Sequence, residues 1–325
     1  MSRSILVITL LSVLAPVAGS AQSCSGGGPY VADACRKAVD LVLFLTPQLA
    51  TAQAGGSATP GQGGAQGKFG AVLFDVRATA VLGTFPKIAS SSFSPVETAT
   101  SFAGSKIILP ALSANVSMGL FRGLSVGVTH VGAVDALATM TFLQGIESNG
   151  VKLALQGSNS KLGFGARVGV LEESLISPGI AVTWIQRDLP VVSLSGTVTG
   201  SGATNPGGSV SLNDFAVKTA AWRVTAAKSL PLLGGLSAGY GQDHYDMSST
   251  VHVAVNGAGS GNGAARLTMT RTSMFAALSL ILGPVRLVGE VGQATGGSVP
   301  VLLNSFGAAP NQSRTYVTAS LRIAF

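Results

Sequence analysis

From residue 68 to the C-terminus, apolar side chains alternate with small or polar ones in one segment after another. Phe74 and Val76 lie on one face of an extended segment, and Asp75 and Arg77 lie on the other. Only a strand points successive side chains to opposite faces. One such segment is weak evidence, but the recurrence of the pattern predicts an all-β chain. We count ten segments, near 68–81, 105–121, 124–141, 158–171, 179–190, 213–228, 235–246, 265–281, 285–294 and 314–325.

The overall composition indicates that one face of these strands meets lipid. Charged residues make up 10% and hydrophobic residues 46% of the 325 residues, and the mean hydropathy is +0.48. Soluble domains carry about 25% charged residues, so this chain is too poor in charge to cover a surface in water. Beyond residue 20, no apolar run reaches the roughly 18 residues of a membrane-spanning helix. The sequence therefore predicts a transmembrane antiparallel β-barrel of about ten strands, in which lipid-facing and lumen-facing residues alternate.

The joins between the segments alternate in length. Bacterial barrels have short periplasmic turns and longer external loops. The joins at 121–123, 171–178, 229–234 and 282–284 are tight, whereas those at 82–104, 142–157, 191–212, 247–264 and 295–313 are long. An even number of strands then places both ends of the barrel on the periplasmic side.

Two pairs of stretches in or beside the long joins also alternate and are interpreted as hairpin extensions of neighbouring strands. These pair residues 191–199 with 209–213, and 251–255 with 267–271. If one of them re-entered the wall, the barrel would have twelve strands.

The last ten residues carry the most specific motif. Val317, Leu321, Ile323 and Phe325 share one face, and the final residue is aromatic. This ending resembles the C-terminal strand of bacterial outer-membrane β-barrel proteins. The resemblance implies a location in the outer membrane, and recognition by the barrel assembly machinery through Tyr316, Leu321, Ile323 and Phe325.

The N-terminus has the pattern of an export signal. Arg3 supplies a positive charge, residues 5–14 are apolar, and Gly19-Ser20-Ala21 offers small residues at a cleavage site. We predict that residues 1–21 are a signal peptide, which indicates the outer membrane of a diderm bacterium. A retained anchor and a lipidated Cys24 are the alternatives.

The chain has two cysteines, Cys24 and Cys35, and both follow the leader closely. Two nearby cysteines in an exported protein usually form a disulfide in the oxidising periplasm. We predict that bond, which leaves no cysteine for metal or redox chemistry.

Residues 22–66 differ from the rest of the chain. Residues 31–53 have the composition of a helix, with Asp33 near its start and Pro47 expected to kink or end it. Residues 55–67 are rich in Gly, Gln and Ala and are predicted to be a flexible linker. This segment is either a periplasmic cap or a plug within the barrel. The barrel itself is predicted to span residues 67–325.

A barrel with a helical N-terminal segment is weakly similar to the fatty-acid-transporter family. That resemblance implies uptake of hydrophobic molecules. The chain departs from the family in lacking its Asn-Pro-Ala segment and in being short for its larger barrel.

Strict alternation assigns a set of charged and amide side chains to the lumen. Arginines outnumber acids in this set, and as a channel lining they would favour anionic or polar solutes. The preferred interpretation is that these charges pair with one another and fill a barrel of this size. The predicted lumen residues are Asp75, Arg77, Asn115, Asp135, Arg167, Arg187, Arg223, Asp243, Arg286, Glu290 and Arg322.

The excess of basic residues has a simple explanation in a barrel. The net charge of +7 becomes +6 without Arg3. No basic run is interleaved with aromatic residues, so nucleic acid is not an expected partner. Outer-membrane lipid and the phosphates of lipopolysaccharide are expected partners instead. His130 and His252 are isolated in the sequence, and no metal site or cofactor is predicted.

Residues 242–246, Gln-Asp-His-Tyr-Asp, suggest an enzyme as an alternative. Proteases of the omptin family also have about ten strands, with Asp and His near the extracellular rim, where such a pair can activate water. Alternation opposes the analogy because it points Asp243 into the lumen and His244 toward lipid. The preferred interpretation is a girdle at the membrane interface formed by Tyr240, His244 and Tyr245.

The leading functional hypothesis is passive transport or binding of small solutes, hydrophobic ones among them. An outer-membrane hydrolase with its site at the rim is the second hypothesis. A structural or adhesive barrel that acts through its external loops is the third.

Overall fold

The computed structural model describes residues 22–325, apart from 90, 128, 149–150, 203–204 and 231–233. The predicted signal peptide, residues 1–21, lies outside the described residues. Ten strands build the barrel wall, and they are β2 (Val72–Pro86), β3 (Gly104–Phe121), β6 (Ala133–Phe142), β9 (Ser160–Leu171), β10 (Gly179–Asp188), β12 (Gly208–Leu230), β13 (Gly234–Val255), β14 (Gly259–Leu282), β15 (Val285–Thr295) and β16 (Arg314–Ala324).

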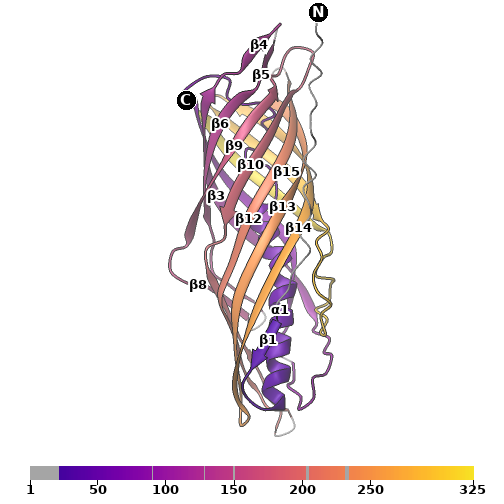
Figure 1. The fold of residues 1–325 in the computed structure, drawn as a ribbon. Coiled ribbons are helices and arrows are strands. Elements are labelled where there is room, and N and C mark those ends of the chain that lie inside the picture. The colour runs from indigo at the N-terminus through magenta and orange to yellow at the C-terminus, as the bar shows by residue number, and fades with distance from the viewer. Residues whose placement is uncertain (1–21, 90, 128, 149–150, 203–204, 231–233) are drawn as a thin grey trace, which may run out of the picture.

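Each wall strand pairs antiparallel with its neighbours in the order of that list, and β16 pairs with β2 to close the ring (Figure 1). Closure pairs each of the ten described wall strands on both sides within the ring, which is what strands in lipid require. The prediction of a barrel of about ten strands is confirmed. The hairpin extensions do not re-enter the wall, so the twelve-strand alternative is wrong.

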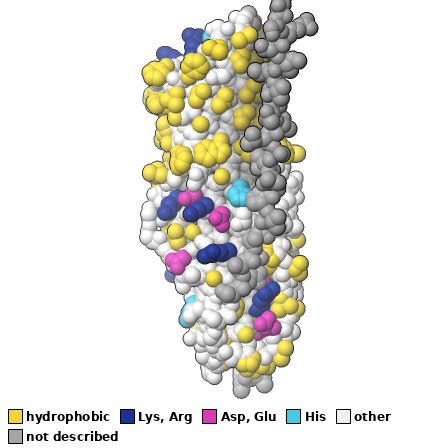
Figure 2. All heavy atoms as spheres, viewed as in Figure 1, with side chains coloured by type: hydrophobic (Ala, Val, Ile, Leu, Met, Phe, Trp, Pro, Cys, Tyr) yellow, Lys and Arg dark blue, Asp and Glu magenta, His cyan; other side chains and the backbone are white. Residues whose placement is uncertain are grey.

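The two faces of the wall follow the predicted alternation. In β2, Phe74 and Val76 are exposed on the outside, while Asp75 and Arg77 are buried inside. Figure 2 shows hydrophobic side chains gathered over the half of the barrel that holds the short joins, with charged side chains beyond them. We call this half the apolar band, its end the turn end, and the opposite end the loop end.

Glycine turns divide one predicted strand. The strands β4 (Leu124–Val126) and β5 (Thr129–Val131) pair with each other at the turn end, apart from the wall, and the wall strand β6 begins only at Ala133. Gly127 and Gly132 have φ of 61° and 76°, a conformation that favours glycine. The prediction of one strand over 124–141 is therefore wrong.

The predicted long loop at 247–264 is also wrong. β13 and β14 continue as one hairpin to the pair Val255 and Gly259, and Val251 pairs with Gly263 rather than with residues 267–271. Inward-facing Val251, Val253 and Leu267 belong to a buried apolar cluster, and this burial outweighs the weak strand preference of the local Gly and Ser residues.

The wall is taller on one side at the loop end. β12, β13 and β14 extend beyond their neighbours, and β11 (Val192–Val198), β8 (Val151–Leu155) and β7 (Ile146–Ser148) continue the sheet from β12. On the other side, the short β1 (Gln22–Ser25) pairs with β14. The predicted disulfide joins Cys24 to Cys35 and so ties β1 to the helix that follows.

That helix, α1 (Pro29–Ala54), lies against the inner face of the tall wall (Figure 1). Pro29 begins the first turn, where its missing N–H costs nothing. Pro47 does not end the helix, because residues on both sides of it, among them Phe44 and Leu49, are packed in the apolar cluster. None of the described helices has both the length and the apolarity needed to cross a membrane.

Residues 55–67 continue from α1 toward the turn end, where the chain enters β2. Residues 55–60 are buried, and the rest of the stretch is at least partly buried. The stretch is bound along its length by inward side chains of the wall, so the prediction of a flexible linker is wrong. We refer to residues 22–67 as the inserted segment.

Candidate functional site

The inner face of the wall carries an excess of buried arginine. Seven arginines and four acidic residues of the ring strands are buried, and all belong to the inward-facing positions. The arginines are Arg77, Arg167, Arg187, Arg223, Arg271, Arg314 and Arg322, and the acids are Asp75, Asp135, Asp243 and Glu290.

The residues predicted for the lumen lie on this face. Asp75, Arg77, Asn115, Asp135, Arg167, Arg187, Arg223, Asp243, Glu290 and Arg322 are each at most 5% exposed. Arg286 is half-buried at the turn end. They do not converge on one point but form a column inside the barrel, with the inserted segment running along it.

The C-terminal end of α1 is held by two arginines. Arg187 Nη2 donates to the carbonyl oxygen of Ala54 at 2.9 Å, and Arg223 Nη2 donates to the same oxygen at 3.2 Å. The last carbonyls of a helix have no partner within the helix and carry partial negative charge. The helix has no basic residue in its own last turn, so the wall supplies the cations.

Gly56 and Ser57 of the inserted segment bind side chains of three wall strands. Arg223 Nε donates to the carbonyl oxygen of Gly56 at 3.2 Å, and Arg77 Nη1 donates to that of Ser57 at 2.6 Å. The backbone N–H of Ser57 donates to both carboxylate oxygens of Glu290, at 3.1 and 3.3 Å. Gly56 has φ +83°, and a Cβ there would lie 2.1 Å from a Glu290 oxygen, so this position requires glycine.

The contacts continue to the turn end. Arg322 donates to the carbonyl oxygen of Pro60. Arg167 Nη1 donates to Thr59 Oγ1 at 2.9 Å and to Gln62 Oε1 at 2.6 Å. The backbone N–H of Gln66 donates to both oxygens of Asp135 at 3.1 Å. Inward-facing side chains of the wall thus hold the inserted segment at several positions between residues 54 and 66.

Among the described residues, only part of the buried charge forms ion pairs within the wall. Arg167 pairs with Asp135 at 2.5 Å, and Arg223 pairs with Asp243 at 2.7 Å. The other contacts of the arginines go mostly to hydroxyl and backbone carbonyl oxygens. The expectation that lumen charges fill the barrel by pairing with one another therefore describes part of the interior, and the inserted segment supplies the remaining acceptors.

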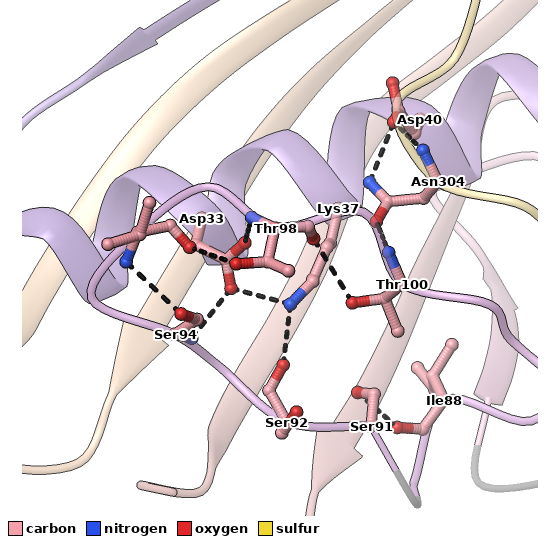
Figure 3. A network of polar contacts seen from close by, with 11 residues as sticks. Asp33, Lys37, Asp40, Ile88, Ser91, Ser92, Ser94, Thr98, Thr100 and Asn304 are labelled. Carbon is pink, nitrogen blue, oxygen red and sulfur yellow. Dashed lines mark hydrogen bonds and ion pairs between the residues drawn. The ribbon is translucent and has the colours of Figure 1, made fainter. Parts of the chain in front are cut away.

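The loop-end part of α1 is fixed by a second polar network (Figure 3). Asp33 accepts from Lys37 Nζ at 2.6 Å and from the backbone N–H of Ser94 at 2.8 Å. Asp40 accepts from the backbone N–H of Asn304 at 3.0 Å and from its Nδ2 at 2.8 Å. The network connects α1 to the β2–β3 and β15–β16 loops.

Replacing Asp40 by alanine is expected to lower the free energy of unfolding by about 1–3 kcal/mol, because buried donors of Asn304 would lose their acceptor. Urea titration of the refolded protein measures the change. Glu97→Ala, at an exposed position of the β2–β3 loop, is the matched control and should change stability by less than about 0.5 kcal/mol. Equal effects of the two substitutions would contradict the role given to Asp40.

The residues of the predicted rim cluster point in different directions. Asp243 is buried and paired with Arg223, whereas His244 lies on the outer face, where Nδ1 is 3.2 Å from Thr270 Oγ1. Tyr240 is exposed beside Trp222, as a girdle residue would be. The girdle prediction is wrong for Tyr245, which faces inward and is fully buried.

The predicted assembly residues lie on both faces of β16. Leu321 and Phe325 are exposed, at 48% and 81%, and Ile323 shares their face. Tyr316 is fully buried on the opposite face, against Gly55 and Gly292.

Sequence reasoning missed several members of the site. Arg271 and Arg314 lie in the predicted strands 265–281 and 314–325 and have inward parity there, so alternation is the signal that could have found them; Arg271 also falls in a predicted hairpin extension. Asp33, Lys37 and Asp40 have a helical spacing of three or four residues, which is also common on exposed helices. Among the described residues, no group of three or more His, Cys, Asp or Glu side chains is placed to hold a metal ion.

Three cavities lie at the two ends of the barrel. A cavity of about 530 Å³ at the loop end is lined by Ser101 and residues 299–311. Two smaller ones, of about 240 and 260 Å³, lie at the turn end, and Gln62 and Arg286 line both of them.

No protein-family model and no curated protein matches the chain. Among solved structures, it is similar to the translocator domain of autotransporter NalP from Neisseria meningitidis, with 9% identity, a TM-score of 0.41, and coverage of 91% of this chain and 99% of that one. An outer membrane channel from Pseudomonas putida F1 has 9% identity, a TM-score of 0.35, and coverage of 82% and 99%. A Pseudomonas aeruginosa FadL homologue has 8% identity, a TM-score of 0.26, and coverage of 86% and 97%. The pairing of β16 with β2, rather than these similarities, identifies the fold as a barrel.

Proposed function

We propose that the chain is an outer-membrane β-barrel for passive passage of small solutes, and that the inserted segment is a plug that closes its lumen at rest. The observation that carries this proposal is the row of contacts from wall arginines to backbone oxygens of residues 54–60. These residues occupy the interior that a solute would have to cross. The apolar band on the outside supports the membrane location.

The same proposal includes a cleaved leader at residues 1–21 and an assembly signal formed by the outward-facing residues Leu321, Ile323 and Phe325 at the C-terminal end. The turn end, which carries the C-terminus, then faces the periplasm, and the loop end faces outward. Because β1 lies at the loop end, the inserted segment crosses the barrel from the outer side to the periplasmic side.

The part of the plug inside the apolar band is the part suited to move. Residues 55–66 are held by hydrogen bonds, for which water can substitute, and each contributes a net stability of only about 0.5–3 kcal/mol. The helix α1 is held instead by extensive apolar burial. The disulfide and β1 keep the plug attached at the loop end.

The charges on the inner face of the wall indicate which ions an open lumen would prefer. The inner face carries seven buried arginines and four buried acidic residues, so its net charge is positive. An unplugged barrel would therefore attract anions and repel cations. Lumen-lining roles are therefore proposed for Arg77, Arg167, Arg187, Arg223 and Arg322.

Single-channel recording in a planar bilayer tests the proposal. We expect the protein of residues 22–325 to show no conductance steps or rare ones. A variant that lacks residues 22–66 should show frequent conductance steps, and its reversal potential in a KCl gradient should shift toward that of chloride. Heat-modifiable migration on gels must first show that both proteins are folded. Silence from both folded proteins would overturn passage through the lumen, and cation preference would overturn the role of the arginines.

A further inference from the structure

Two arginines face each other at the turn end of the barrel. Arg286 of β15 and Arg322 of β16 are direct partners in the strand register, and both point inward. Like charges placed opposite each other on neighbouring strands destabilise a sheet. This pair therefore requires compensation from a group of opposite charge.

The side chains nearby supply only part of that compensation. Arg322 is 3% exposed, and its Nε and Nη1 have no hydrogen-bond partner. None of the ion pairs found among the described residues includes Arg286. Asp75 is the register partner of Arg322 on the other side, but its Oδ1 accepts from Asn115 and no ion pair joins it to Arg322 within the described structure.

A cavity of about 260 Å³ opens beside the two guanidinium groups. Its polar lining comes from Arg286, Arg322, Gln62 and Gln66, and no carboxylate lines it. Gln62 Oε1 accepts from Arg167, so the amide nitrogen of Gln62 remains to donate. The neighbouring cavity of about 240 Å³ also touches Arg286, but Glu172, Glu173 and Lys228 line it as well, so its lining has mixed charge.

We propose that the cavity between Arg286, Arg322 and Gln62 binds a tetrahedral oxyanion of the phosphate type. Guanidinium groups present paired N–H donors that match such an oxyanion, and hydrogen bonds to it would satisfy the buried nitrogens of Arg322. The volume holds an oxyanion together with several waters, since one water occupies about 30 Å³. The site lies at the mouth of the proposed lumen, but it requires no conduction, so it can exist in a barrel that never opens.

Isothermal titration calorimetry of the refolded protein, residues 22–325, in a non-ionic detergent tests the site with inorganic phosphate at constant ionic strength. We expect saturable binding that Arg286→Gln weakens at least about tenfold, as the loss of charge-assisted hydrogen bonds predicts. Arg286→Lys keeps the charge but loses the paired donors and should weaken binding less. Arg266→Gln, at an exposed position of β14 near the loop end, is the matched control and should leave binding unchanged.

A second titration uses micelles that contain phosphatidylglycerol in place of free phosphate. Binding of both probes with the same dependence on Arg286 supports a site for free oxyanions. Binding of the lipid alone, again weakened by Arg286→Gln, supports a site for a lipid phosphate. Absence of binding, or equal binding by wild type and Arg286→Gln, overturns the proposal, whatever the bilayer recordings show.

Discussion

Replacing Arg223 by methionine is expected to lower the free energy of unfolding of the barrel by about 3–5 kcal/mol, because Asp243 would remain buried without its partner. Arg223 Nη2 lies 2.7 Å from Asp243 Oδ1, and the two side chains are at most 1% exposed. The same substitution removes the bonds from Arg223 to the carbonyls of Ala54 and Gly56. Urea unfolding in lipid vesicles, followed by tryptophan fluorescence, measures the loss.

A double variant separates the two contributions. Arg223→Met with Asp243→Leu removes both charges, and it should recover the part of the loss that comes from unpaired Asp243, since a buried ion pair replaced by apolar residues is often neutral. The loss that remains then measures the missing bonds to the carbonyls of Ala54 and Gly56. Arg271, the register partner of Asp243 on β14, and Arg187 are two further cations close enough to interact with Asp243. A loss below about 1 kcal/mol for the single variant would mean that these arginines compensate Asp243, contrary to the pairing described above.

The barrel itself could be predicted because a strand in a membrane wall must alternate. The parity of Phe74 and Asp75 alone assigned one side chain to lipid and the other to the interior, and the same rule placed Asp243 inside and His244 outside. The partners of the arginines could not be predicted, because they are the backbone carbonyls of Ala54, Gly56 and Pro60. Every residue has such a carbonyl, so the sequence does not show which ones accept.

The two faces of a long strand exchange polarity along its length, and this explains the largest errors of the sequence-based prediction. In the apolar band, β13 turns Leu236 outward and Ser237 inward. Beyond Asp243 the pattern reverses, and the inner face carries Tyr245 and Val251. Outside the membrane the outer face meets water and the inner face packs on α1, so the same strand needs the opposite pattern. If apolar residues are assumed to face outward along the whole strand, residues 247–264 are predicted to be a loop and Tyr245 a girdle residue. Both predictions are wrong.

The inserted segment follows the same division. Within the apolar band, residues 55–66 are polar or small and bind to charged side chains of the wall. Beyond the band, α1 offers apolar residues such as Phe44 to an apolar inner face. The two parts therefore differ in what holds them, and a substitution at the loop end tests whether they also come apart separately.

Phe306→Ala is expected to remove about 3–5 kcal/mol from the docking of the loop end, the usual cost of deleting a buried phenyl ring. Phe306 is 1% exposed. Its ring stacks on Phe44 of α1 at 4.9 Å and on Phe102 of the β2–β3 loop at 5.0 Å. Residues 87–103 and 296–313 should lose protection against hydrogen exchange, while the amides of β15 and β16 in the apolar band keep it, as expected when part of a protein opens locally.

Val301→Ala is the matched control, because Val301 belongs to the same loop and is 94% exposed, so its protection pattern should equal that of the wild type. If Phe306→Ala also exposes the amides of residues 55–66, then the apolar packing of α1 holds the whole inserted segment in place, and opening of the lumen must begin at the loop end. If those amides stay protected, the wall arginines hold residues 55–66 independently, and the lumen can open at the turn end while α1 remains docked. A loss of protection in Val301→Ala equal to that in Phe306→Ala would refute the anchoring role of the phenyl stack.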